Sequence, residues 1–217
     1  MIASKIGQPN LPKSMPQLAP SVKLEPATTL EGIEIDQANW AGQKSKLAHI
    51  DSVRLIKPDL TGAILREGGW EDVEIIGGQL GGLNLTGSSL RRVLIQRARL
   101  SGIVLAETEL KDIIIEDTKL DLANFRFAKL SRVRFMRCQL IDADFGGAHL
   151  VDVDFTNCDL TSADFSGATI KQVDLRSSVV RQIKGIGGLE GATINYDQMI
   201  TLVPELAAGL GIEVKND

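Results

Sequence analysis

Histidine and cysteine are the residues of this chain best suited to hold a metal ion or to act as a nucleophile, and each occurs only twice. His49 and His149 lie far apart in the sequence, and Cys138 and Cys158 form neither a CxxC motif nor a disulfide framework. The glycine-rich stretch 77–87 lacks the GxxxxGK[ST] and GxGxxG patterns, so it predicts no phosphate-binding loop. No nucleophile–base pair stands out. We therefore expect no enzymatic activity, no metal site and no cofactor.

Charged side chains are the other groups that could act chemically, and they are unevenly distributed although the net charge is only −4. Residues 91–140 hold eleven Lys or Arg against six Asp or Glu, a net charge of +5. Residues 141–217 hold five basic against twelve acidic residues, a net charge of −7. This asymmetry indicates either regions with different partners or an ordinary solvated surface.

Two charged segments follow each other directly. A basic belt without intervening acidic residues consists of Arg126, Lys129, Arg132, Arg134 and Arg137. An acidic zone then consists of Asp142, Asp144, Asp152, Asp154, Asp159, Asp164 and Asp174. These carboxylates either bond local backbone groups or form a binding surface for a partner.

A five-residue period must position these side chains. Every fifth residue from Leu30 to Val180 is large and apolar, and Ser45 is the one exception among the thirty-one positions. A second column, two residues earlier, is mostly small or β-branched. Because alternate residues of an extended segment point to the same side, both columns face inward. A period of five fits neither a helix nor a flat strand and indicates a short extended stretch followed by a tight turn.

The units at 123–127, 143–147 and 163–167 read ANFRF, ADFGG and ADFSG, and they resemble the A(D/N)(L/F)xx consensus of the pentapeptide-repeat family. The resemblance implies an all-β fold, a right-handed quadrilateral (four-sided) parallel β-helix with four repeats in each twenty-residue coil. Coils of that length would stack about 4.8 Å apart. His49 and His149 would then lie five coils apart, too far to share a metal ion. The two cysteines would lie one coil apart at inward positions, where a disulfide is geometrically conceivable but buried thiols are favoured.

The same coil length predicts how the aromatic core stacks. Phe125, Phe145 and Phe165 lie one coil apart and should form one column of rings. Phe135 and Phe155 should form another column on the opposite face.

The chain divides into three parts: a proline-containing N-terminal arm (1–29), a pentapeptide-repeat β-helix (30–185) and a C-terminal α-helical cap (186–217). Ser45 predicts an irregular early turn. Asn195 and Gln198 predict a capping box, Pro204 should split the following helix into two, and residues 212–214 could form a last strand. An apolar stripe with helical spacing is expected to join two subunits and consists of Met199, Leu202, Val203, Leu206 and Leu210.

The sequence leaves three functions open. Some bacterial members of the family are dimers that mimic DNA, bind DNA gyrase and protect it from quinolones; the steady period of this chain resembles the loop-free mycobacterial type. A generic protein-interaction scaffold is the alternative. Direct nucleic-acid binding through the basic belt is disfavoured, since the remaining surface repels phosphate. The first ten residues resemble no signal peptide, and we expect a cytoplasmic protein without membrane contact.

Overall fold

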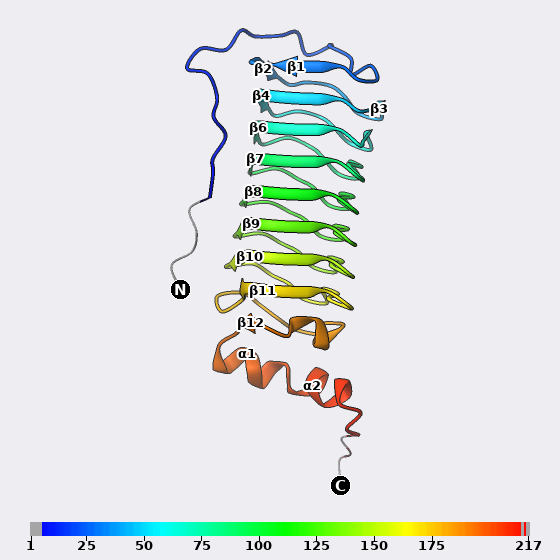
Figure 1. The fold of residues 1–217 in the computed structure, drawn as a ribbon, viewed down its shortest axis with the longest axis vertical. Coiled ribbons are helices and arrows are strands. Elements are labelled where there is room, and N and C mark those ends of the chain that lie inside the picture. The colour runs from blue at the N-terminus through cyan, green and yellow to red at the C-terminus, as the bar shows by residue number, and fades with distance from the viewer. Residues whose placement is uncertain (1–5, 214, 216–217) are drawn as a thin grey trace.

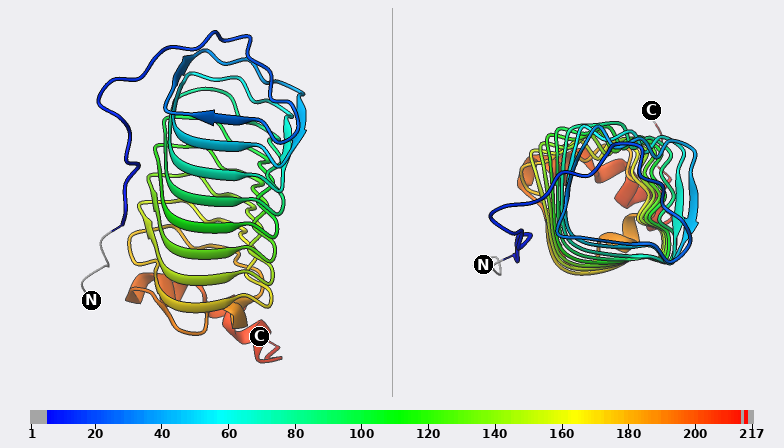
Figure 2. Two further views of the ribbon diagram at one scale, coloured as in Figure 1. Left: turned by 45° about the horizontal axis from the view of Figure 1, so that its top comes forward. Right: turned by 90° about the horizontal axis from the view of Figure 1, so that it is seen from above.

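The computed structural model describes residues 6–213 and 215, which form a four-sided rod of stacked coils (Figures 1 and 2). One face of the rod is a parallel sheet in the order β1-β4-β6-β7-β8-β9-β10-β11-β12. Its strands are β1 (Thr29–Glu31), β4 (His49–Ile56), β6 (Gly69–Ile76), β7 (Ser89–Gln96), β8 (Glu109–Glu116), β9 (Lys129–Met136), β10 (His149–Thr156), β11 (Thr169–Asp174) and β12 (Ala192–Thr193). The short strand β2 (Glu34–Asp36) pairs with β4, and β3 (Lys44–Lys46) pairs with β5 (Ile64–Arg66).

The register of the sheet confirms the twenty-residue coil. From β1 to β11 each residue pairs with the residue twenty positions later, as Leu130 does with Leu150. The offset falls to nineteen at the last pair of strands, where Val173 pairs with Ala192, so the register changes near the C-terminal end of the rod. The predicted parallel β-helix with a helical C-terminal cap is therefore confirmed.

Ser45 does not interrupt the coil, and the prediction of an irregular turn there is wrong. It lies in β3 and pairs with Leu65 in the normal register. Its side chain is buried, and Oγ donates a hydrogen bond to the Glu25 carbonyl at 3.0 Å. A polar residue fits this core position because the N-terminal arm provides a carbonyl acceptor above it.

The backbone turns each corner through one left-handed residue. At every fifth position from Ala27 to Gln172, φ lies between 46° and 70°. Only nine of these thirty positions are glycine, although other residues disfavour this conformation by roughly 1–2 kcal/mol each. Each eight-residue strand of the sheet contains such a corner, which explains why the register omits Asp72 and its equivalents.

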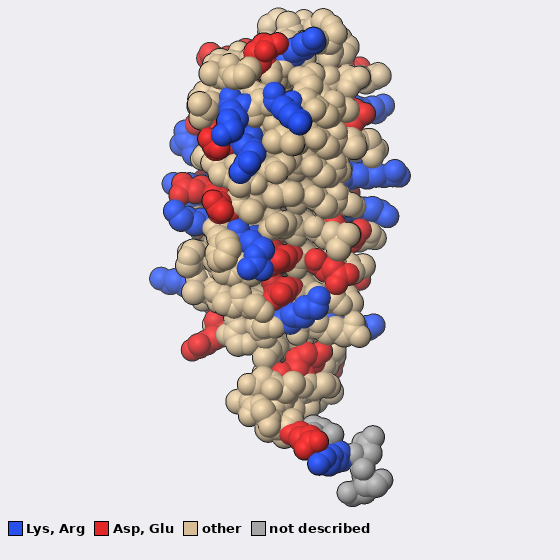
Figure 3. Space-filling model, turned by 90° about the vertical axis from the view of Figure 1, so that its right-hand side faces the viewer, with Lys and Arg blue, Asp and Glu red and all other residues tan. Residues whose placement is uncertain are grey.

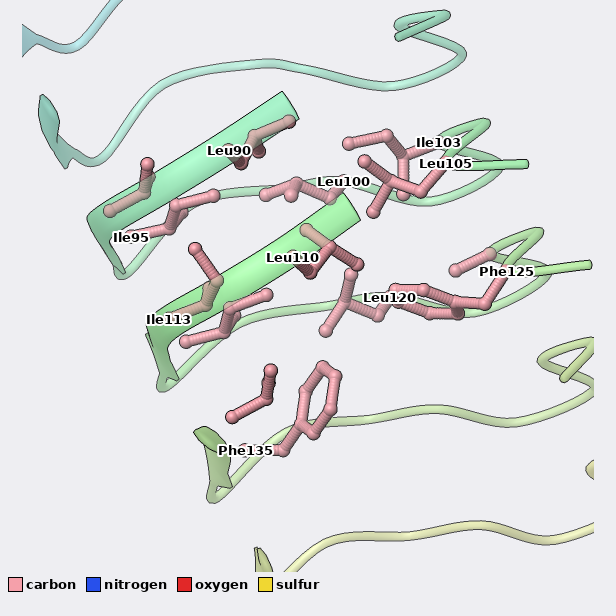
Figure 4. Close-up of a cluster of buried hydrophobic side chains, with 14 of the residues drawn as sticks. Leu90, Ile95, Leu100, Ile103, Leu105, Leu110, Ile113, Leu120, Phe125 and Phe135 are labelled. Atoms are coloured by element: carbon pink, nitrogen blue, oxygen red, sulfur yellow. The ribbon is translucent and has the colours of Figure 1, made fainter. Parts of the chain in front are cut away.

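The interior of the rod is a stack of like side chains. Phe145 stacks on Phe125 at a centroid distance of 4.7 Å and on Phe165 at 5.0 Å. Phe135 and Phe155 stack at 4.9 Å, and the two columns meet edge to face at 5.9 Å. Both predicted columns are thus confirmed, and in the preceding coils leucine and isoleucine occupy the same places (Figure 4).

The N-terminal arm has two parts. Residues 16–28 close the end of the rod, where Leu24 is buried and the Trp40 indole donates to the Val22 carbonyl at 2.8 Å. Residues 6–15, here called the strap, run beside the coils toward the C-terminal end (Figure 1). The backbone N–H of Asn10 donates to Asp72 at 2.8 Å, and that of Gly7 donates to Asp112 at 3.3 Å.

The C-terminal end is closed by the short 3₁₀ helix η1 (Ile186–Leu189) and by helices α1 (Tyr196–Thr201) and α2 (Val203–Gly209). Asn195 and Gln198 form the predicted capping box. Pro204 lies in the first turn of α2, so the predicted division into two helices is confirmed. Gln198 Nε2 also donates to two carbonyls of the last coil, those of Leu175 and Ser178.

The strand predicted over residues 212–214 is not found. Ile212 and Glu213 follow α2 without strand structure, and Val214 lies outside the described residues. The α2 helix ends at Gly209, and the left-handed Gly211 turns the chain away from the rod end, so these residues meet no strand of the described part of the chain.

Substitution of Phe145 by Ala should lower the free energy of unfolding by about 3–5 kcal/mol, because it removes a buried ring that stacks on two others. Denaturant unfolding followed by circular dichroism would measure the change. Phe127→Ala is the matched control, since that ring is 55% exposed, and it should change stability by less than about 0.5 kcal/mol. Equal effects of the two substitutions would contradict the stacked core.

Candidate functional site

Every member of the basic belt forms an ion pair with a carboxylate of a neighbouring coil. Pairs with the preceding coil are Lys129–Glu109, Arg132–Asp112 and Arg137–Asp117, at 2.6–2.8 Å. Pairs with the following coil are Arg126–Asp144 at 3.2 Å and Arg134–Asp152 at 2.9 Å. The belt is therefore not a free cationic band that could bind phosphate. Its positive charge is neutralised along the rod axis.

The carboxylates of the acidic zone also have partners within the rod, either hydrogen-bond donors or cationic side chains. Asp144, Asp164 and Asp174 each accept a hydrogen bond from the backbone N–H two residues later, at 2.8–3.0 Å. This is the local bonding that their repeat position predicts. Asp154 differs, because it accepts from the Thr156 hydroxyl at 3.0 Å and faces Arg134 at 3.8 Å.

The remaining carboxylates of the zone are held in similar ways. Asp159 accepts from the Thr161 N–H at 2.9 Å, and Asp142 lies 3.8 Å from Lys184. The Arg176 guanidinium beside Asp174 lowers the pKa of that carboxyl. Among the described residues, Asp159 and Asp164 are the members of the zone without an ion-pair partner within 4.0 Å. Figure 3 shows one face of the rod, where acidic and basic side chains are interspersed.

A column of left-handed corner residues alternates in charge, and the five-residue period does not predict it. It contains Asp72, Arg92, Asp112, Arg132 and Asp152, one per coil. Arg92 donates two hydrogen bonds to the Asp72 carboxylate, at 2.5 and 2.6 Å, and Arg132 donates two to the Asp112 carboxylate, both at 2.6 Å. Reading the sequence at a period of twenty rather than five would have revealed this alternation.

Two aspartates of this column also hold the strap. Burial alone would raise the pKa of Asp72, but hydrogen bonds from Arg92 and from the Asn10 N–H outweigh it and lower that pKa. The Arg132 guanidinium, with help from the Gly7 N–H, lowers the pKa of Asp112. Both carboxylates therefore stay ionised at neutral pH and can accept the main-chain N–H groups of the strap.

The histidines and cysteines are not brought together into a site. Cys138 and Cys158 are buried free thiols in adjacent coils, and the neighbouring Cys158 thiol together with burial raises the pKa of Cys138. Within residues 6–213 and 215, no group of three His, Cys, Asp or Glu is arranged to hold a metal ion. No helix in this part of the chain is long and apolar enough to cross a membrane.

The C-terminal end carries the apolar residues that were predicted to join two subunits. Met199, Val203, Leu206 and Leu210 are exposed, Leu210 by 77%. Leu202 is instead only 1% exposed and belongs to the core of the rod, so it is not available to a second subunit. The prediction that Leu202 joins two subunits is therefore wrong. Helical spacing alone does not separate the inner face of so short a helix from its outer face.

Further apolar groups extend this surface. Tyr196, Ile200 and Ile212 are also exposed. Beside them lies a hollow of about 810 Å³ between the last coil and α2, lined by groups that include Ile186, Leu206 and the glycines of η1. One oxygen of Glu205, which also lines the hollow, is buried and has no hydrogen-bond partner among the described residues. The end of the rod is thus a hollowed apolar surface, unlike its charged sides.

The fold and its columns of repeated side chains define a solenoid repeat protein built from five-residue units. Residues 108–184 match the family model described as a pentapeptide repeat region. Residues 108–184 are therefore similar to a pentapeptide repeat region, and the same twenty-residue register continues over the coils before residue 108. The comparison with curated proteins gives no match.

Solved structures of pentapeptide-repeat proteins are similar to this chain at low sequence identity. Trypsin-treated QnrB1, described as a plasmid-mediated fluoroquinolone resistance protein, is 17% identical with a TM-score of 0.46; the match covers 94% of this chain and 100% of that chain. HetL, from the cyanobacterium Nostoc sp. strain PCC 7120 and involved in heterocyst differentiation regulation, is 22% identical with a TM-score of 0.32. That match covers 73% of this chain and 83% of HetL.

Arg134→Met should lower the free energy of unfolding by about 3–5 kcal/mol, because it leaves Asp152 and Asp154 without their buried cation. The side chains of Arg134 and Asp152 are only 11% and 17% exposed, and methionine itself fits where the two preceding coils carry Leu94 and Ile114. Chemical unfolding would measure the loss.

Lys129→Met is the control for this substitution. The Lys129–Glu109 pair is 66% and 62% exposed, so its loss should cost less than about 1 kcal/mol. If both substitutions lowered the free energy of unfolding equally, the effect of Arg134→Met would not come from the burial of its ion pair.

Proposed function

We propose that this chain is a non-enzymatic protein-binding rod that pairs with a second copy of itself through its C-terminal end. The exposed apolar surface of α1 and α2 carries the proposal. A large apolar area at one end of a molecule whose sides are charged is typical of a protein–protein contact. The proposal includes a cytoplasmic setting, which the two free thiols support.

A second copy is the occupant that this end fits best. The surface combines projecting side chains, such as Leu210 and Tyr196, with the hollow beside α2. In a two-fold contact the same patch meets itself, so the projecting groups of each copy can enter the hollow of the other. Such a closed contact leaves no apolar end uncovered, whereas a head-to-tail contact would leave one.

The sides of the rod would then be available to another protein. A narrower form of the proposal names DNA gyrase as that protein, with the acidic zone imitating the phosphates of DNA. It is favoured by the net charge of −7 in residues 141–217 and by Asp159 and Asp164, which have no ion-pair partner in the described part of the chain. The ion pairs of Asp144, Asp152 and Asp174 count against it, because they neutralise the row that a DNA mimic would need. The geometry therefore supports a general protein-binding rod better than a DNA mimic.

Leu210→Glu combined with Val203→Glu should convert a dimer into a monomer, because four carboxylates would meet across the two-fold contact. Sedimentation equilibrium should give twice the chain mass of 23.4 kDa for the unchanged protein and the single mass for the variant. Both residues are exposed, so the fold should persist.

Leu47→Glu is the matched control for the dimer. It is an exposed leucine at the other end of the rod, and Glu67 and Glu107 already occupy the same left-handed position in later coils. It should remain dimeric. A monomeric mass for the unchanged protein at tens of micromolar would overturn the proposed self-association.

The gyrase form predicts that the purified protein changes DNA supercoiling by gyrase at micromolar concentration, with or without ciprofloxacin. Replacing Asp144, Asp154 and Asp164 by Asn should remove that effect, since Asn keeps the local hydrogen bonds but not the charge. Absence of any effect of the unchanged protein would exclude gyrase as partner. An effect that survives in the triple variant would exclude mimicry by the acidic zone.

A further inference from the structure

The strap lies on a regular row of carboxylates. Asp72, Asp112 and Asp152 occupy the same corner of the coil at intervals of two coils, and an Arg separates each from the next. Two coils span about 9.6 Å along the rod, and three residues of extended chain span about 10 Å. The three-residue interval from Gly7 to Asn10 therefore matches the interval from Asp112 to Asp72.

The rod holds the strap through its main chain. The hydrogen bonds from residues 6–15 to the coils, within the described part of the chain, are the two backbone N–H bonds to Asp72 and Asp112. Pro9 and Pro12, on either side of Asn10, favour the extended conformation that brings these N–H groups into register. Recognition of this kind depends on extended shape and on N–H spacing more than on side chains.

One position of the strap is nevertheless selective. A Cβ atom on Gly7 would lie 3.2 and 3.3 Å from the Arg92 side chain, closer than an ordinary contact. Arg92 cannot easily move, because Asp72 holds it by two hydrogen bonds and Glu71 by a further one. The surface beside Arg92 therefore favours glycine at position 7 of the strap.

The row continues past the described strap. Asp152 lies two coils beyond Asp112, and its Oδ2 is buried without a hydrogen-bond partner among the described residues. Its other oxygen, Oδ1, accepts from Arg134 at 2.9 Å. A peptide N–H three residues before the glycine would reach this acceptor by the same spacing. The row is thus longer than the contacts that residues 6–15 make with it.

We propose that the Asp72–Asp112–Asp152 row is a docking track for an extended, proline-containing segment of a partner protein, and that the strap covers the track until such a segment displaces it. The fitting segment carries glycine over Arg92 and a free N–H three residues later, as the Gly7–Gln8–Pro9–Asn10 sequence does. This inference concerns the side of the rod and does not depend on self-association through its C-terminal end.

Asn10→Pro in the full chain tests the proposal, because proline removes the one N–H that binds Asp72 while keeping an extended backbone. Gln8→Pro is the matched control, since the Gln8 N–H forms no hydrogen bond to the rod within residues 6–213 and both donors remain. Trypsin should cleave after Lys13 at least fivefold faster in Asn10→Pro than in the unchanged protein or in Gln8→Pro. Equal cleavage rates in all three would overturn the role of the Asp72 contact.

A fluorescent peptide with the sequence IGQPNLPKS, identical to residues 6–14, then reports on the open track. Fluorescence anisotropy should show binding to Asn10→Pro with a Kd at least tenfold lower than for the unchanged protein, in which the strap competes. Adding Asp72→Ala and Asp112→Ala to Asn10→Pro should abolish binding, because both acceptor oxygens are then lost and Ala27 shows that alanine can occupy a left-handed corner position of this kind.

The peptide IGQPPLPKS, which lacks the same N–H, provides a control that leaves the protein untouched. It should bind at least tenfold more weakly than IGQPNLPKS. Equal binding of the two peptides, or binding that survives loss of both carboxylates, would overturn the track. Failure of IGQPNLPKS to bind Asn10→Pro would overturn it as well.

Discussion

The structure depends on one repeated constraint, a left-handed residue at every fifth position of the coil. From Ala27 to Gln172 the backbone meets this constraint thirty times, and twenty-one of those residues are not glycine. Each such residue is disfavoured in isolation. The parallel ladders and the apolar stack offset that cost only when every coil has the same length, because each corner must lie above the one before it. This requirement fixes the coil at twenty residues and places residue i above residue i+20.

Because of that register, the surface chemistry is organised in columns along the rod rather than in segments along the chain. Arg126 lies close to Asp144, and Arg137 lies close to Asp117, although each pair is about twenty residues apart in sequence. Counting charges over consecutive residues gives a basic belt and an acidic zone. In the folded rod, however, the charges of both are largely neutralised by neighbouring coils. Three members of the belt pair with carboxylates that lie outside the acidic zone, and two pair with Asp144 and Asp152 within it. This is the physical reason why the sequence overstated both charged surfaces.

The core and the C-terminal cap could be predicted because they follow local rules. The inward column is visible at a period of five, and the capping box of Asn195 and Gln198 involves only four residues. The strap could not be predicted, since its contacts join Gly7 to Asp112 and depend on how the arm bends at the end of the rod. The regular, buried position of Ser45 could not be predicted for the same reason, since the carbonyl that accepts its hydrogen bond belongs to the N-terminal arm. Leu202 was misassigned because only the packed structure separates the inner face of α1 and α2 from the outer one.

The two ends of the rod are closed by different means, and this difference separates two kinds of recognition. At the N-terminal end Leu24 and the chain around it cover the last apolar layer, and the chain then continues down one side as the strap. At the C-terminal end Gln198 and Leu202 cover the layer, but their helices expose a new apolar surface of their own. That surface suits a permanent contact, because nothing in the described chain covers it. The strap contact suits an exchangeable one, since it rests on two main-chain hydrogen bonds that another extended segment with the same spacing and a glycine over Arg92 can form. The helices α1 and α2, which carry the apolar surface, lie at the end of the rod, and the strands β6, β8 and β10, which carry the carboxylate row, form its side (Figures 1 and 2). Occupation of one therefore leaves the other accessible.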